Sequence, residues 1–213
     1  MRLRAGALAL ALVGLFSLPA AAEGLVLFVQ GGVNQANPNT DVGLKNYTAE
    51  SSAGTGIVAG LGLEGRLSNV FTSQVDVLWV QRNTDVMWEG EGRAPIDASY
   101  EVSYVDIPWT IRARFGSRKF RFFLTGGVVS SIAVDAKSNN TSDGIEEEFD
   151  VDEQFHGWNL SLLGGLGFDV QLGSTTWLRL EGRYLYGLKN ITTDESNWKT
   201  RDLQGLIGVG IDL

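Results

Sequence analysis

The sequence predicts an all-β fold: an eight-stranded, antiparallel, up-and-down transmembrane β-barrel. Three observations predict it. They are short runs in which apolar and polar residues alternate, connections that are alternately long and short, and aromatic residues near the ends of the runs. In barrels of this kind, lipid-facing and lumen-facing residues alternate along each strand, and short periplasmic turns stand opposite longer extracellular loops. An even number of strands places both ends of the barrel on the side of the short turns.

Eight runs of alternating residues mark the predicted strands. They begin near Leu25, Gly54, Phe71, Tyr100, Phe120, Trp158, Trp177 and Arg201. The connections between them are long and polar at 34–53, 83–99, 135–157 and 189–200, and short at 67–70, 116–119 and 172–176. Because long and short connections alternate strictly, the pattern indicates a chain that crosses a slab with different surroundings on its two sides.

The parity of residues along each run separates a predicted lipid face from a predicted lumen face, because successive side chains of a strand point to opposite sides. In the sixth run, Leu162 and Leu166 share one face, whereas Ser161 and Asp169 share the other. A soluble, lipocalin-like barrel would show the same alternation with the faces reversed. Aromatic residues at the run ends and the apolar alternation of the last run favour the membrane barrel.

The first 22 residues are predicted to be a secretory signal peptide. Arg2 and Arg4 precede an apolar stretch that ends at Phe16, and Ala20-Ala21-Ala22 offers a cleavage site before Glu23. The apolar stretch is shorter than the ~20 residues that a spanning helix needs. The predicted organisation is a signal peptide at 1–22 and one barrel domain at 23–213, exported to the cell outer membrane.

Composition excludes several partners and chemistries. Without Arg2 and Arg4, the chain has 15 basic against 25 acidic side chains, so we predict no binding to nucleic acid or anionic lipid through a basic surface. The chain contains no cysteine and therefore no disulfide framework. Its 27 glycines suit a small barrel, in which strands bend sharply and large side chains would crowd.

Charged residues of both signs fall on the predicted lumen face. The acidic ones are Glu64, Asp76, Asp106, Asp169 and Glu181, and the basic ones are Arg66, Arg112, Arg114, Arg121, Arg179 and Arg183. One interpretation is a polar permeation path or a ligand site. An eight-stranded barrel is just wide enough inside for its own side chains, and arginine can bind carboxylates through two hydrogen bonds. We therefore predict an ion-pair network with a structural role.

Two further features are interpreted structurally. Pro108 falls in the middle of a run and cannot donate a ladder hydrogen bond, so it is predicted to mark a bulge or local kink. The acidic run 146–153 could bind Ca²⁺ or bridge to lipopolysaccharide through divalent cations, but it lacks the EF-hand pattern. A solvated loop is the expected state of this run.

The sequence offers little for catalysis. His156 is the only histidine, no G-x-S-x-G elbow is present, and no metal-binding spacing occurs. We predict no catalytic residue, no metal site and no cofactor. Exposed aromatic residues in the long connections, such as Trp88 and Trp198, could contact a partner or could pack the loops onto one another.

Three segments carry a resemblance to a known family. Residues Tyr104-Val105-Asp106-Ile107-Pro108, the segment Gly60–Arg82 and the stretch from Arg183 to Ile191 occur in the order of the family's motifs. Together they resemble the PorT-like outer-membrane β-barrel family. The resemblance implies an eight-stranded outer-membrane barrel from a Bacteroidetes-like bacterium, and it implies no activity.

The predicted function is that of a non-enzymatic outer-membrane protein with a structural role or a role in interactions through its loops. Expected partners are membrane lipid, lipopolysaccharide, and an extracellular or envelope protein that binds the loops. The alternatives are a narrow channel for small solutes and a soluble ligand-binding barrel.

Overall fold

The computed structural model describes residues 24–37, 39–41, 47–90, 96–117, 119–142, 145–150, 158–188, 197–199 and 201–213. Side-chain environments are described for 24–37, 52–84, 101–117, 119–135, 158–188 and 201–213. Strands dominate this part of the chain, which contains no helix long and apolar enough to cross a membrane.

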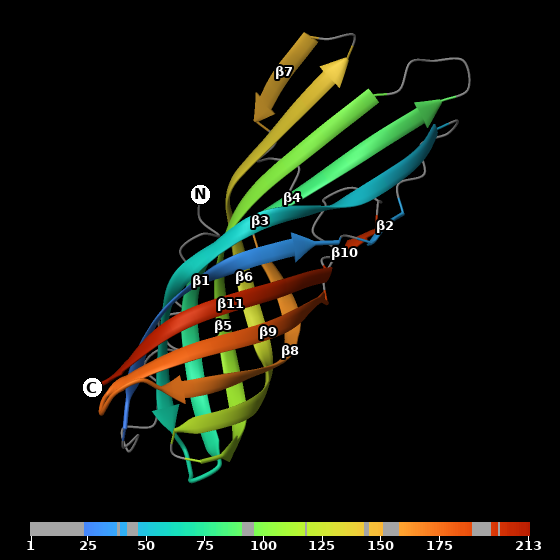
Figure 1. The fold of residues 1–213 in the computed structure, drawn as a ribbon. Coiled ribbons are helices and arrows are strands. Elements are labelled where there is room, and N and C mark those ends of the chain that lie inside the picture. Colours follow the sequence, from blue (N-terminus) through green and yellow to red (C-terminus); the bar gives the residue numbers. More distant parts are fainter. Residues whose placement is uncertain are drawn as a thin grey trace.

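Eight long strands form the barrel. They are β1 (Val26–Ala36), β3 (Tyr47–Arg66), β4 (Phe71–Gly90), β5 (Ile96–Gly116), β6 (Phe120–Ser142), β8 (Trp158–Gln171), β9 (Thr176–Gly187) and β11 (Arg201–Asp212). Each pairs antiparallel with its neighbours along the chain, and β1 pairs with β11 to close the circle. Three short strands complete the set: β2 (Asn39–Asp41), β7 (Ile145–Asp150) and β10 (Asn197–Lys199). The predicted eight-stranded antiparallel barrel is confirmed (Figure 1).

One end of the barrel carries the short turns and both ends of the barrel sheet. Val26 pairs with Asp212 at this end, and the Leu213 N–H donates to the Leu25 carbonyl at 2.9 Å. The turn after β3 is held by the Ser68 hydroxyl, which accepts from the Phe71 N–H at 3.0 Å. We call this end of the barrel the turn end.

The turn between β5 and β6 requires a glycine. Gly116 has a φ of +122°, a conformation that other residues rarely adopt, and a Cβ at this position would lie 2.6 Å from the Phe120 carbonyl oxygen. The tight reversal after β5 therefore depends on this residue.

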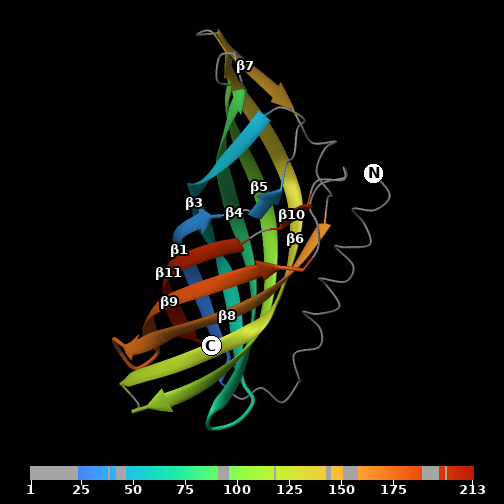
Figure 2. The same cartoon turned by 90° about the vertical axis from the view of Figure 1, so that its right-hand side faces the viewer.

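At the opposite end, half of the barrel wall continues as an open sheet. β1 pairs with β3 only up to Gly54, and β8 pairs with β6 only up to Ile132. Beyond these points the strands remain paired in the order β3-β4-β5-β6-β7 (Figures 1 and 2). We call this part the sheet extension; it comprises 47–53, 83–90, 96–103, 134–142 and 145–150.

The sheet extension corrects the predicted loop boundaries. Much of the predicted loops 34–53, 83–99 and 135–157 is strand, and part of the acidic run forms β7 rather than a loop. The reason lies in the sequence. At 137–142 polar residues fill both parities, so the apolar alternation stops although the backbone ladder continues. At 96–103 the alternation persists, but its apolar residues have the parity that faces the lumen along the rest of β5.

The barrel surface is apolar outside and polar inside, as the parity predicts. Trp109 and Leu166 are 57% and 56% exposed, whereas Arg112 on the opposite face of β5 is fully buried. At the turn end, Phe120 stacks on Phe168 with 5.6 Å between ring centroids. Such an outward apolar band with aromatic residues near its edges fits a bilayer.

Pro108 does not mark a bulge. The ladder between β4 and β5 runs from the pair Val75–Trp109 to the pair Leu78–Asp106 in an unchanged register, with two rungs absent between them. The register shift of β5 lies instead against β6, between Ser103 and Tyr104. The missing N–H of proline therefore interrupts the ladder locally without inserting a residue.

Candidate functional site

The lumen contains a dense group of ion pairs whose centre is Glu64. This carboxylate on β3 is 1% exposed and accepts from Arg112 Nη1 at 3.0 Å and from Arg179 Nη2 at 2.9 Å. Arg114 also donates to it. Three arginines from β5 and β9 thus converge on one carboxylate, which is possible because the barrel places the inward faces of these strands opposite β3.

Arg179 is the most heavily bonded member of the group. It binds Asp169 through Nε–Oδ1 at 2.7 Å and Nη2–Oδ2 at 3.0 Å, the parallel geometry that suits a guanidinium and a carboxylate. Its guanidinium carbon lies 3.7 Å from the centroid of the Phe28 ring. Gln74 accepts from Arg179 Nη1 at 2.6 Å, so an amide from β4 joins the group.

A second set of pairs extends the group along the lumen. Arg183 binds Asp76 at 3.0 Å and Glu181 at 2.8 Å, and Arg112 binds Glu181 at 2.8 Å. We call the whole set the central network; its members are Glu64, Gln74, Asp76, Arg112, Arg114, Asp169, Arg179, Glu181 and Arg183. Four arginines face four carboxylates, so the central network is electrically balanced.

Asp106 belongs to a separate cluster nearer the sheet extension. It accepts from Arg82 Nη1 and Nη2 at 3.2 and 2.7 Å, and Asp202 accepts from Arg82 Nε. The guanidinium of Arg82 lies 4.5 Å from the centroid of the Tyr104 ring. This cluster, which lies toward the sheet extension, contains two carboxylates and one arginine.

Sequence reasoning missed Arg82 and Asp202, although a signal for them exists. Arg82 has the same parity as Gln74 and Asp76 on its strand, and Asp202 has the same parity as Gln204 on the last strand. Each residue lies where an apolar run gives way to a polar connection. Continuing the parity by one step from Gln204 to Asp202, and by three steps from Asp76 to Arg82, would have assigned both residues to the lumen.

Arg66 and Arg121 lie outside the two networks. Arg121 is half-buried at the turn end, with its guanidinium 4.2 Å from the centroid of the Trp177 ring, and Arg66 is exposed. Neither forms an ion pair with any described residue. Every other charged residue predicted for the lumen forms an ion pair with a described residue.

The two groups of ion pairs can hold the barrel interior rigidly, but only if every charged member keeps its partner. Burying charges is costly unless they are paired and hydrogen-bonded, and the removal of one partner leaves an uncompensated buried charge. Arg112, Arg179 and Arg183 are all at most 1% exposed, and they project across the lumen from β5 and β9. Their side chains therefore occupy the middle of the barrel.

The described residues contain no group of three or more histidine, cysteine, aspartate or glutamate side chains arranged to hold a metal ion. His156 lies outside the described residues, as do the side chains of the acidic run 146–153.

The closed barrel, its apolar outer face and its charged lumen define a transmembrane β-barrel of the outer-membrane type. Residues 24–193 match the family described as outer membrane protein beta-barrel domain, and the chain belongs to this family. The protein is accordingly located in the outer membrane, in contact with its lipids. This location excludes the soluble barrel that the alternation of residues left open.

Solved structures show the same fold. OprG from Pseudomonas aeruginosa is 15% identical, with 90% of this chain and 97% of that chain covered and a TM-score of 0.54. The outer membrane protease OmpT from Escherichia coli is 9% identical over 91% and 98% of the two chains, with a TM-score of 0.51. At these identities the likeness concerns the fold alone. No curated protein sequence matches the chain significantly.

Proposed function

We propose that this protein is a non-enzymatic component of the outer membrane that presents its sheet extension to a protein partner outside the cell. The observation that carries the proposal is the extension itself. The strands β3, β4, β5 and β6 continue past the ends of their neighbours, and β7 pairs with β6. Together these five strands form a sheet beyond the barrel wall.

The edges of the sheet extension offer a means of binding. Residues 47–53 of β3 pair only with β4, and β7 pairs only with β6 among the described residues. An edge strand carries unpaired N–H and C=O groups that can add a strand from a partner. The sequence of β7, Ile-Glu-Glu-Glu-Phe-Asp, is strongly acidic and would oppose pairing with a second copy of itself. A partner with a basic edge or segment fits this strand best.

The filled lumen supports a structural role for the barrel rather than transport. Each carboxylate of the central network accepts from at least one arginine, and three of these pairs, Arg112–Glu64, Arg112–Glu181 and Arg183–Asp76, join strands that are not neighbours in the barrel wall. A water path through the barrel would have to break several buried pairs at once.

Photo-crosslinking on intact cells tests the interaction. A photoreactive residue is placed at Thr48 on the β3 edge or at Glu147 on β7, with Ser68 at the turn end as the matched control. We expect a defined adduct with a second protein from the edge positions and none from Ser68. Equal adducts at all three positions, or none at either edge, would contradict the proposal.

A narrow channel is the second candidate, because charged side chains line the lumen. Planar-bilayer recordings of the purified protein distinguish the two functions. We expect no steady currents from the wild type, and none from Arg183→Gln. Discrete openings whose size changes with Arg183→Gln would establish a channel instead.

Three finer assignments complete the proposal. We infer that residues 1–22 are a cleaved signal peptide, that the chain is of the PorT-like type within its family, and that it has no enzymatic activity. The first is tested by N-terminal sequencing of the mature protein, which should begin at Glu23. An unchanged lipid profile of cells that carry His156→Ala would support the last.

A further inference from the structure

The turn end of the barrel contains a cavity that is lined by cations. Arg66 at the end of β3, Arg114 on β5 and Arg121 on β6 line a space of about 210 Å³ between two turns. Its other polar lining residues are Asn69 and the hydroxyl-bearing Ser68, Thr72 and Ser117. No carboxylate is among the described residues that line it, so three positive charges face one small cavity.

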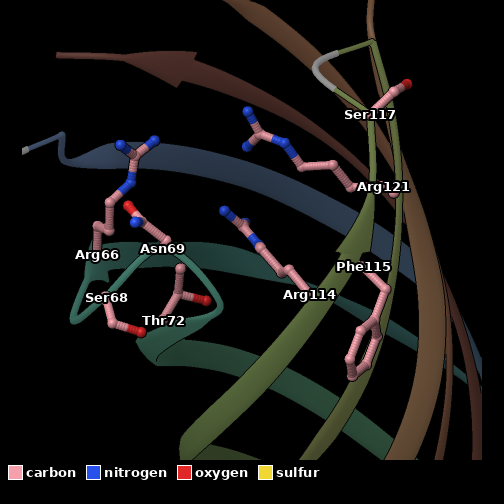
Figure 3. Close-up of a pocket in the computed structure, with 9 residues that line it drawn as sticks. Arg66, Ser68, Asn69, Thr72, Arg114, Phe115, Ser117 and Arg121 are labelled. Atoms are coloured by element: carbon pink, nitrogen blue, oxygen red, sulfur yellow. The ribbon is translucent and has the colours of Figure 1, made fainter.

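The three guanidinium groups are directed into the same space. In Figure 3, the side chains of Arg66, Arg114 and Arg121 extend from separate strands toward one another, and the Asn69 amide lies beside Arg66. Arg66 and Arg121 have no ion pair with a described residue, and Arg114 uses one nitrogen for Glu64 and Asp169. Like charges that face one cavity repel each other, and an anion bound between them would relieve this repulsion.

Two buried polar atoms of the lining have no partner in the described part of the protein. Thr72 is 2% exposed, and its hydroxyl oxygen makes no hydrogen bond. Arg114 Nε is likewise buried without an acceptor. Buried donors normally find acceptors, because an unmet donor carries the full cost of its desolvation. An oxyanion in the cavity would give both donors a partner.

The adjoining space offsets only part of the positive charge of the arginines. A second cavity of about 410 Å³ shares Arg66, Arg114 and Arg121 and is also lined by Glu64 and Asp212. Glu64 is already bound by arginines of the central network, so Asp212 is the one carboxylate of this lining that remains to offset the charges of Arg66 and Arg121. The positive charge at this end of the lumen therefore exceeds what these carboxylates balance.

We propose that the cavity between Arg66, Arg114 and Arg121 at the turn end is a binding site for a phosphate oxyanion. A phosphate group presents several strong acceptor oxygens, and guanidinium groups match its geometry through paired hydrogen bonds. The site is separate from the sheet extension and lies at the opposite end of the molecule.

Two sources can supply the phosphate group. Phe115 lines the cavity and is 51% exposed on the outer face, next to the aromatic residues at the turn end of the barrel. The cavity thus opens at the level where lipid headgroups meet water. The phosphate is either that of a phospholipid headgroup or a free phosphate in the periplasm.

The site is tested by measuring phosphate binding to the full barrel. The protein is kept in dodecyl maltoside, because this detergent has no phosphate group. Inorganic phosphate is titrated at low ionic strength and followed by calorimetry. We expect saturable binding that Arg66→Gln/Arg121→Gln weakens about tenfold or more, equivalent to ~1.4 kcal/mol. Lys119→Gln, which removes an exposed positive charge at the same end without lining the cavity, should change affinity by no more than about twofold.

A lipid arm separates the two sources. Native mass spectrometry of the protein with phosphatidylglycerol should show one retained lipid that the double variant loses and Lys119→Gln keeps. Binding in this arm alone identifies a headgroup site, and binding in the calorimetric arm alone identifies a free-phosphate site. Equal behaviour of wild type, double variant and Lys119→Gln in both arms overturns the proposal.

A single substitution tests the site in a variant that is expected to fold normally. Arg66 is exposed and makes no ion pair with described residues, so Arg66→Gln should leave the barrel intact, as a boiled-versus-unboiled gel would show. A folded Arg66→Gln protein with unchanged affinity for both ligands would remove Arg66 from the site and contradict the geometry proposed here.

Discussion

At the scale of single residues, Arg183 provides the clearest test of charge balance in the lumen. Its side chain is fully buried and joins Asp76 to Glu181. Arg183→Met would leave Asp76 with only the Gln74 amide beside it, a buried charge without a countercharge. Breaking a buried pair from one side costs about 3–5 kcal/mol. We expect a loss of this size in the free energy of unfolding, measured by urea titration in lipid vesicles.

The double variant Arg183→Met/Asp76→Asn restores the balance of charge and serves as the control. Because it removes one charge of each sign, it should recover a large part of the lost stability, since Glu181 keeps its bond to Arg112. If the double variant is as unstable as Arg183→Met alone, the loss comes from packing and not from the unpaired carboxylate.

At the scale of the elements, the sheet extension is separable from the barrel. Every barrel strand keeps both neighbours in the part that crosses the membrane, and Asn83 pairs with Glu101 where β4 and β5 leave it. Replacing residues 84–100 with Asn-Gly, which suits a two-residue hairpin, should therefore preserve the barrel. We expect a band that still shifts on boiling and a change in unfolding free energy of about 1 kcal/mol or less.

Failure of this shortened protein to insert into vesicles would show that the extension guides assembly. The same replacement should abolish photo-crosslinking from Thr48, because residues 47–53 lose β4 as their pairing partner. Crosslinking that persists would place the binding surface elsewhere.

The strands that the sequence predicted well are those with two different surroundings. Where one face meets lipid and the other the lumen, as along β8, parity alone assigned each residue to the correct side. In the sheet extension that contrast is lost at 137–142, where both parities are polar, and at 96–103 the apolar residues change parity, so much of these strands was assigned to loops. The same loss of contrast concealed Arg82 and Asp202, whereas their partner Asp106, in the middle of an apolar run, was found. Which carboxylate meets which arginine depends on the register between distant strands, which no single run contains.

At the scale of the whole molecule, the outer face and the lumen obey opposite rules, because each meets a different solvent. The outer face is covered by large apolar side chains, and the middle of the lumen is filled by the paired charges of the central network. A charge is thus stable inside the barrel, where partners surround it, and unstable outside, where lipid offers none. The cost outside must also depend on depth, since side chains near either edge can reach water.

A pair of arginine substitutions measures this depth dependence. Leu166 lies on the outer face within β8, and Leu172 follows β8 in the turn, where it is 63% exposed. Leu166→Arg should lower the unfolding free energy by about 2–4 kcal/mol, whereas Leu172→Arg should lower it by about 0–1 kcal/mol. Urea titrations in vesicles of one lipid give both values under the same conditions. Equal costs at the two positions would mean that the turn end lies at the same depth as the middle of β8, which would contradict the placement of the phosphate site at the headgroup level.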